Sequence, residues 1–177
     1  MERGQIWVET VIYTLIGLAL IGIVLAIATP KINDAKDRAL IGQSIESMNS
    51  FDEKIREVVE KGQWNVRKID SFSLKKGEMQ INSSGDEIIF TLDNLAKPYS
   101  EPGVEIELGN LKLISELGQK KSIVKIKLNY AGIANITFDG GESSRSFGAN
   151  TIPYSFSFEN LGTTGGLVDI DVKEVSR

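Results

Sequence analysis

The chain of 177 residues contains no cysteine and no histidine. Without cysteine there is no disulfide framework and no thiolate nucleophile. The two absences together exclude zinc sites built from Cys and His, Cys–His pairs and Ser–His–Asp triads. Catalysis would have to rest on carboxylates, lysine, tyrosine or a Ser–Lys pair, and no such arrangement stands out. We therefore predict a protein that is not an enzyme and that needs no cofactor or metal.

A strong excess of positive charge is also missing. The formal net charge is −4, the isoelectric point is about 5.0, and Lys and Arg form no basic stripe. Nucleic acid is therefore not an expected partner. The length suits one domain with an appendage.

The most distinctive stretch is apolar. Between Glu9 and Lys31 there is no charged side chain. Residues 5–29, written as a helix at ~1.5 Å per residue, span ~37 Å, more than a hydrocarbon core of ~30 Å. A cleaved secretory signal fits less well, because its apolar region is usually ~7–15 residues long and the best cleavage site, at 26–29, is weak. We predict a transmembrane helix over residues 5–30.

Glu9 stands at the start of this stretch. A carboxylate in an apolar segment is costly in a membrane and usually functional, although at the membrane edge it could simply reach water. Gly4 is a small residue at the junction with the charged leader 1–4. A cut after Gly4 would leave Glu9 one helical turn from a new α-amine, whose pKa of ~7.7–8.0 keeps it largely protonated at neutral pH. That amine could neutralise the carboxylate on the same chain or on a neighbour.

These residues carry a resemblance. A short leader ending in Gly4, Gln5 at the start of the mature chain, Glu9 at its fifth position and Pro30 near the end of a long apolar helix resemble type IV pilins, in particular archaeal ones with a class III signal peptide. The resemblance implies that a membrane prepilin peptidase cuts between Gly4 and Gln5. It also implies that the helices then pack into a filament core, with Glu9 as the docking carboxylate.

The function implied is that of a structural subunit, a pilin or a pilin-like protein of an archaeal surface filament. The precursor would be a single-pass membrane protein with its C-terminal domain outside the cell, and the mature chain would self-associate through its N-terminal helices. Adhesion would lie in the C-terminal domain.

Two alternatives remain open. Three cations follow the apolar stretch, Lys31, Lys36 and Arg38, whereas Arg3 precedes it, and the positive-inside rule alone would place the C-terminal side in the cytoplasm. The first alternative is a permanently anchored single-pass protein with an extracellular, ligand- or partner-binding β-rich domain. The second is a secreted enzyme cut near Thr29.

Residues 31–62 have the pattern of an amphipathic helix. Apolar side chains recur at three- and four-residue steps: Ile32, Ala35, Ala39, Ile41, Ile45, Met48, Phe51, Ile55 and Val58. Pro30 predicts a kink in one long helix, and Gly62 is a good stop signal.

Residues 63–177 show the two-residue period of half-buried strands. The segments 78–82 and 87–93 predict a hairpin with its turn at 83–86. Further strands are expected near 104–108, 111–117, 122–130, 135–138, 152–160 and 167–175, with a flexible Gly/Ser-rich loop over 138–150. We predict an α+β fold in which the helix packs on an antiparallel sheet or small sandwich, forming an extracellular domain.

Polar candidates in this domain have ordinary interpretations. Asp169 and Asp171 share a strand face with Glu174 nearby, which we interpret as a solvated face rather than a Ca²⁺ site. Asn82 and Asn135 begin Asn-x-Ser/Thr sequences and are possible N-glycosylation sites if the domain is outside the cell.

Overall fold

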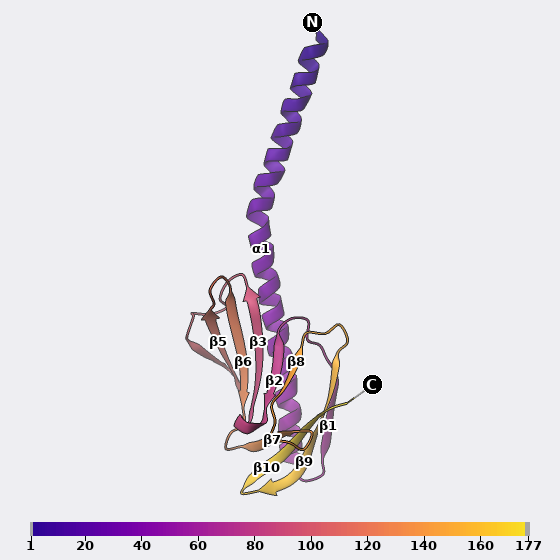
Figure 1. Ribbon diagram of the computed structural model, residues 1–177, viewed down its shortest axis with the longest axis vertical. Helices are drawn as coiled ribbons and strands as arrows, with labels where there is room; N and C mark the ends of the chain where they lie inside the picture. Colours follow the sequence, from indigo (N-terminus) through magenta and orange to yellow (C-terminus); the bar gives the residue numbers. More distant parts are fainter. Residues whose placement is uncertain (1, 176–177) are drawn as a thin grey trace.

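A single helix dominates the molecule. The computed structural model describes residues 2–175, with side chains described from Trp7 onward. Helix α1 (Glu2–Lys61) is 60 residues long, and its N-terminal part projects from a β-rich body (Figure 1). It ends where predicted, because Gly62 adopts a left-handed conformation with φ of +84° that a residue with a Cβ rarely adopts.

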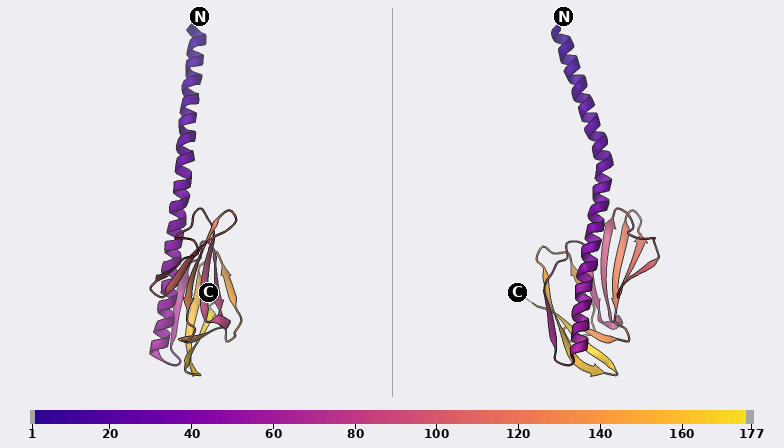
Figure 2. Two further views of the ribbon diagram at one scale, coloured as in Figure 1. Left: turned by 90° about the vertical axis from the view of Figure 1, so that its left-hand side faces the viewer. Right: turned by 180° about the vertical axis from the view of Figure 1, so that it is seen from behind.

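Pro30 lies inside α1 and does not end it. Proline lacks the N–H that would bond to the carbonyl four residues earlier, and its ring crowds that carbonyl, so a helix usually bends there. The right-hand view of Figure 2 shows the helix bending along its length before it reaches the body. The prediction of one long helix with two different halves is confirmed.

After α1, the described residues form ten strands and one 3₁₀ turn in two sheets. The four-stranded sheet has the order β1-β9-β10-β7, and the six-stranded sheet has the order β4-β5-β6-β3-β2-β8. The bounds are β1 (Val66–Phe72), β2 (Glu78–Asn82), η1 (Ser83–Gly85), β3 (Glu87–Leu95), β4 (Glu105–Leu108), β5 (Leu111–Leu117), β6 (Ser122–Asn129), β7 (Ala134–Phe138), β8 (Arg145–Gly148), β9 (Tyr154–Thr164) and β10 (Leu167–Glu174).

Alternating side chains explain the sheets. In β6, Val124, Ile126 and Leu128 are buried while Lys125 and Lys127 lie on the outer face. The predicted hairpin is the β2–β3 pair, closed by η1, and Asp86, directly after η1, has φ of +51°.

Two details of the sheets differ from the prediction. The pair β7–β10 is parallel, so the four-stranded sheet is mixed rather than purely antiparallel. The stretch expected to be a flexible loop contains β8, which pairs with β2. Its buried Phe147 contacts Phe138, Tyr154 and Phe156 edge-on, and this aromatic packing holds the strand in place.

The second half of α1 packs on both sheets (Figure 2). Phe51 is fully buried among Phe72 of β1 and Phe156 and Phe158 of β9, with ring centroids 4.6–5.6 Å apart. The prediction that the buried apolar stripe begins at Ile32 is wrong. Ile32 is 51% exposed, and Ala35 and Ala39 are also exposed. Apolar burial against the body begins only at Ile41, since the sheets do not reach further along the helix.

The predicted α+β architecture is thus confirmed. One long N-terminal helix packs, through its second half only, on two β-sheets.

Candidate functional site: the apolar arm

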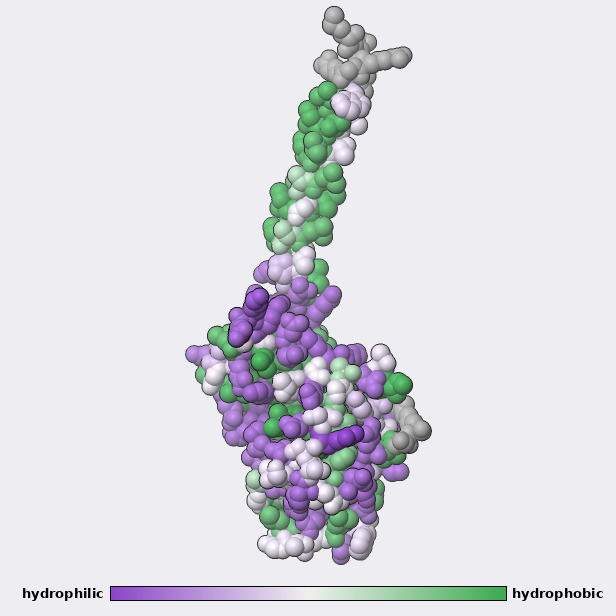
Figure 3. Space-filling model, in the orientation of Figure 1, coloured by the Kyte–Doolittle hydropathy of each residue, from purple (hydrophilic) through white to green (hydrophobic). Residues whose placement is uncertain are grey.

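The first half of α1 has apolar side chains on all its faces and no part of the body against it. We call residues 7–29 the apolar arm. Its large apolar side chains are between 37% exposed (Val11) and 70% exposed (Trp7). Figure 3 shows the arm as a continuous hydrophobic rod above a largely polar body.

This exposure is energetically unfavourable in water. Burying one Val, Leu or Ile side chain is worth ~1.5–3 kcal/mol, and soluble monomers rarely expose apolar patches above a few hundred Å². The described helix is long and apolar enough to cross a membrane, with a mean hydropathy of 2.7 over its most apolar window and none of that window buried. The arm is therefore a candidate membrane span.

The polar groups of the arm suit a surrounding without water. The hydroxyl of Thr14 donates to the carbonyl of Thr10 at 2.8 Å, and that of Thr29 donates to the carbonyl of Leu25 at 2.7 Å. Such bonds to the preceding turn satisfy hydroxyls where water is excluded. A Cβ added at Gly17 or Gly22 would meet nothing within 4 Å, so both positions leave room for a neighbouring helix.

Three predicted site residues lie at the N-terminal end of this helix. Glu9 is exposed near the start of the arm. Gly4 and Gln5 are in α1, and they precede Trp7, where the described side chains begin. Pro30 marks the end of the arm.

Just beyond Pro30, two aspartates that the sequence analysis did not single out connect α1 to the body. The Asp37 carboxylate accepts a hydrogen bond from the Ala96 N–H at 2.6 Å and lies 3.8 Å from the Lys76 ammonium. Asp34 lies 3.8 Å from the Lys97 ammonium and 3.6 Å from Arg38 Nε. These contacts hold the helix against the β3–β4 loop at the point where it leaves the body. Their sequence signal is weak, because aspartates three apart on a helix are common.

A buried carboxylate in the second half of α1 forms hydrogen bonds to the β-rich body. Asp52 is 6% exposed and accepts hydrogen bonds from the Tyr130 hydroxyl (2.8 Å), Asn110 Nδ2 (2.6 Å) and Arg56 Nε (3.0 Å). Burial, reinforced by the negative charge of Asp52, raises the pKa of Tyr130 far above its usual range. A neighbouring cavity of about 280 Å³, lined partly by Ile55 and Ile133, opens to solvent.

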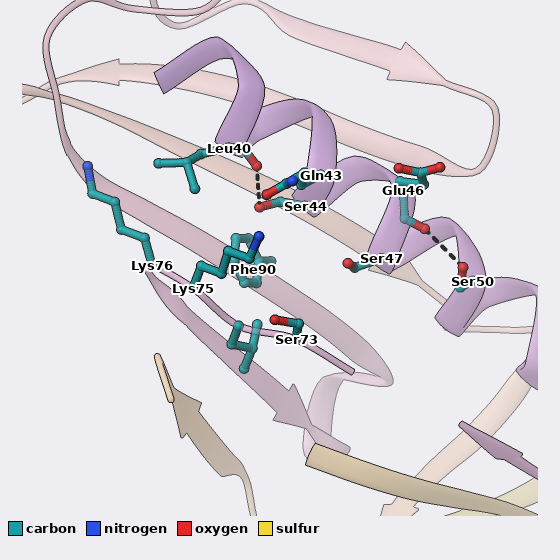
Figure 4. Close-up of a pocket in the computed structure, with 11 residues that line it drawn as sticks. Leu40, Gln43, Ser44, Glu46, Ser47, Ser50, Ser73, Lys75, Lys76 and Phe90 are labelled. Atoms are coloured by element: carbon teal, nitrogen blue, oxygen red, sulfur yellow. Dashed lines mark hydrogen bonds between the residues drawn. The ribbon is translucent and has the colours of Figure 1, made fainter. Parts of the chain in front are cut away.

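A second hollow, of about 340 Å³, lies between α1 and the segment joining β1 to β2 (Figure 4). Ser47 and Ser73 face it, and Ser44 and Ser50 on its helical wall donate to carbonyls one turn back, at 2.9 and 3.1 Å. Glu46, Lys75 and Lys76 line the same hollow. Across residues 7–175, no group of three or more acidic side chains could hold a metal ion.

The structure separates the two candidate glycosylation sites and brings one of them, Asn135, into contact with Asp169. Asn82 Oδ1 accepts hydrogen bonds from the hydroxyls of Ser84 and Ser144, each at 3.0 Å. Asn135 Nδ2 donates to Asp169 Oδ1 at 3.0 Å, and a glycan there would replace one of the two N–H groups of this nitrogen. The two asparagines are on different sheets, Asn82 at the end of β2 and Asn135 in β7.

The expected solvated face is wrong for Asp171, which is 2% exposed. The Thr137 hydroxyl and the Gly140 N–H each donate to its Oδ1 at 2.8 Å, because the turn after β7 folds over it. Asp171 therefore has a structural role, because its carboxylate holds the turn after β7 against β10.

Comparisons of the chain with protein-family models, with characterised proteins and with solved structures gave no match. The functional argument therefore rests on the arm and on the residues that position it.

Proposed function

We propose that this protein is a structural subunit, a pilin or pilin-like protein, of an archaeal type IV pilus-type surface filament. The observation that carries the proposal is the apolar arm, an uncovered apolar rod built as one helix with a firmly docked second half. The precursor lies in the cell membrane as a single-pass protein with its body outside. A prepilin peptidase cuts after Gly4, and the arm then moves from lipid into the core of an extracellular filament.

The geometry supports this sequence of events in two ways. An arm that touches no other part of its chain gains the same apolar burial from lipid as from neighbouring arms, so it suits both states. The docked half makes the arm and the body one elongated unit, so packing of arms would also arrange the bodies around the core. The role assigned to the protein is assembly, with no catalytic step.

Glu9 has a defined part in this proposal. Its carboxylate is costly in lipid unless it is neutralised. Cleavage after Gly4 creates a protonated amine one turn away on the same chain, within reach of a neighbouring copy in a bundle of arms. Pairing with that amine would favour docking of a processed subunit over an unprocessed one.

The test is to replace Glu9 in the native host and to image filaments. Glu9→Ala and Glu9→Gln should both abolish filaments while the precursor stays in the membrane at its normal level, because both remove the charge. Glu53→Ala removes an exposed glutamate from the docked half of the same helix and should leave filaments at their normal number. Normal filaments in the Glu9→Ala strain would show that this role is wrong.

A second candidate is a permanent single-pass anchor for a ligand- or partner-binding domain. One observation favours it: the open cavity beside Asp52. An anchor predicts an unprocessed N-terminus and no role for Glu9 in assembly, so the same strains distinguish it.

A further inference from the structure

The end of the body nearest to the arm is built from loops of the six-stranded sheet. The strand register pairs Ser122 with both Leu95 and Leu117, so β3 and β5 end and β6 begins at the same edge. The bond from the Ala96 N–H to Asp37 places that edge beside α1 where the arm emerges. Figure 1 shows the upper ends of β3, β5 and β6 close to the helix at this level. Residues 96–104 and 118–121 therefore flank the base of the arm.

This end of the body carries a concentration of cations. We call the following exposed residues the basic collar: Lys31, Lys36 and Arg38 of α1, Lys97 of the β3–β4 loop, and Lys120 and Lys121 of the β5–β6 turn. Hydrophilic side chains surround the base of the arm in Figure 3.

The carboxylates at the same end are fewer than the cations, and two of them face the body. Asp34 and Asp37 are directed to the β3–β4 loop, where they contact Lys97 and the Ala96 N–H. Asp93, near the end of β3, and Glu101, in the β3–β4 loop, are exposed, so four carboxylates stand against the six cations of the collar. The collar thus leaves an excess of positive charge beside the arm, although the whole chain has a net charge of −4.

An exposed apolar side chain accompanies these lysines. Leu117, at the end of β5, is 69% exposed and directly precedes the turn that bears Lys120 and Lys121. Basic side chains next to exposed apolar ones are the combination that binds at a membrane surface, where the apolar group enters the headgroup region and the cations meet lipid phosphates.

We propose that the basic collar binds the anionic phosphate headgroups of the leaflet from which the arm emerges. Continuity with the arm supports a lipid surface as the occupant, because a span that ends near Thr29 places Lys31 and Lys36 at headgroup depth. Charge complementarity supports it too, since each lysine near an anionic surface favours the bound state about five-fold. The inference needs only an arm that lies in a membrane, and it is independent of filament assembly.

The experiment uses the full chain reconstituted in vesicles, with an environment-sensitive fluorophore on a single introduced cysteine. The chain has no cysteine of its own, so labelling is specific. Gln119→Cys places the probe in the β5–β6 turn of the collar end. Thr163→Cys places it near the β9–β10 turn, at the opposite end of the body (Figure 1).

Vesicles of neutral phosphatidylcholine are compared with vesicles that contain phosphatidylglycerol. The probe at position 119 should shift to the blue only with the anionic lipid, and 0.5 M salt should reverse the shift because it screens surface charges. The probe at position 163 should not respond.

Charge variants then identify the residues. Lys120→Glu with Lys121→Glu should abolish the shift, and the milder pair Lys120→Gln with Lys121→Gln should reduce it. Lys61→Glu with Lys68→Glu reverses two exposed lysines at the far end of α1 and on β1, and should leave the shift intact. Equal shifts in neutral and anionic vesicles, or an unchanged shift in both collar pairs, would overturn the proposal and leave a contact between copies as the explanation of the collar.

Discussion

The two halves of α1 contain similar apolar side chains in opposite surroundings. Leu18 and Leu25 are 60% and 58% exposed, whereas Met48, Phe51 and Ile55 are fully buried. The second half is apolar on a stripe, and two sheets of the same chain cover that stripe. The first half is apolar all round, and a helix of that kind needs a covering on every side. The arm therefore lacks a covering from the described chain, and we propose that lipid or other copies supply it.

The largest expected effect is the difference in unfolding free energy between truncating an apolar side chain in the docked half and truncating one in the arm. Phe51→Ala opens a cavity in the aromatic cluster and should lower the free energy of unfolding of the body by about 3–5 kcal/mol. Leu18→Ala in the arm should change it by less than about 0.5 kcal/mol, because Leu18 touches no part of the body. Urea unfolding in detergent micelles, followed by near-UV circular dichroism, measures both. Equal losses would contradict the separation of the two halves.

A second substitution tests the boundary between the halves. Asp37→Ala removes the carboxylate that accepts from the Ala96 N–H and should cost about 1.5–3 kcal/mol. It should also broaden the distribution of distances between spin labels at Leu18→Cys and Thr163→Cys, since the arm loses a fixed exit point. Asp34→Ala is the control, because its ion pairs of 3.6 and 3.8 Å are worth only about 0–1 kcal/mol. An unchanged distribution in the Asp37 variant would show that packing from Ile41 onward suffices to direct the arm.

The smallest expected change in stability comes from Tyr130, whose hydroxyl donates to Asp52 on the docked half of α1. The folded-state pKa of Tyr130 is raised, so its contribution to stability is complete below the unfolded pKa of ~10 and is lost as the pH rises above it. The free energy of unfolding should fall by about 1.4 kcal/mol per pH unit above that point from this group. Tyr130→Phe should cost about 1 kcal/mol at pH 7 and should remove this part of the slope. Identical slopes in the parent protein and in Tyr130→Phe would contradict this role of Tyr130.

Local patterns were sufficient for much of the fold. The change from an apolar run to a stripe predicted the two halves of α1, Gly62 predicted the end of the helix, and alternation predicted the β2–β3 hairpin. Each of these depends on residues close together in the sequence, where periodicity and turn chemistry decide the structure.

Features that depend on distant residues could not be predicted. The parallel pairing of Ala134 with Val168 reflects the choice of a partner strand, which no local pattern specifies. β8 was missed because Phe147 is its one buried side chain and the aromatic partners of Phe147 come from two other strands, β7 and β9. Asp171 stands between apolar residues in the sequence, as an exposed strand residue does. It is buried because the turn after β7 folds over it.

The candidate site divides in the same way. The arm was evident from composition alone, and the structure adds that nothing in residues 7–175 packs over it. The contacts of Asp34 and Asp37 and the gathering of Lys97, Lys120 and Lys121 at the base of the arm required the fold, because they join segments about 60 to 85 residues apart in the sequence.

We propose that the arm is a temporary membrane span that joins a filament core after processing. The N-terminal residue of the protein isolated from the surface of native cells tests it most directly. The account predicts that this protein begins at Gln5 and is recovered in sheared filaments. Surface protein that begins at Met1 and stays in the membrane fraction would contradict it and would favour the permanent anchor.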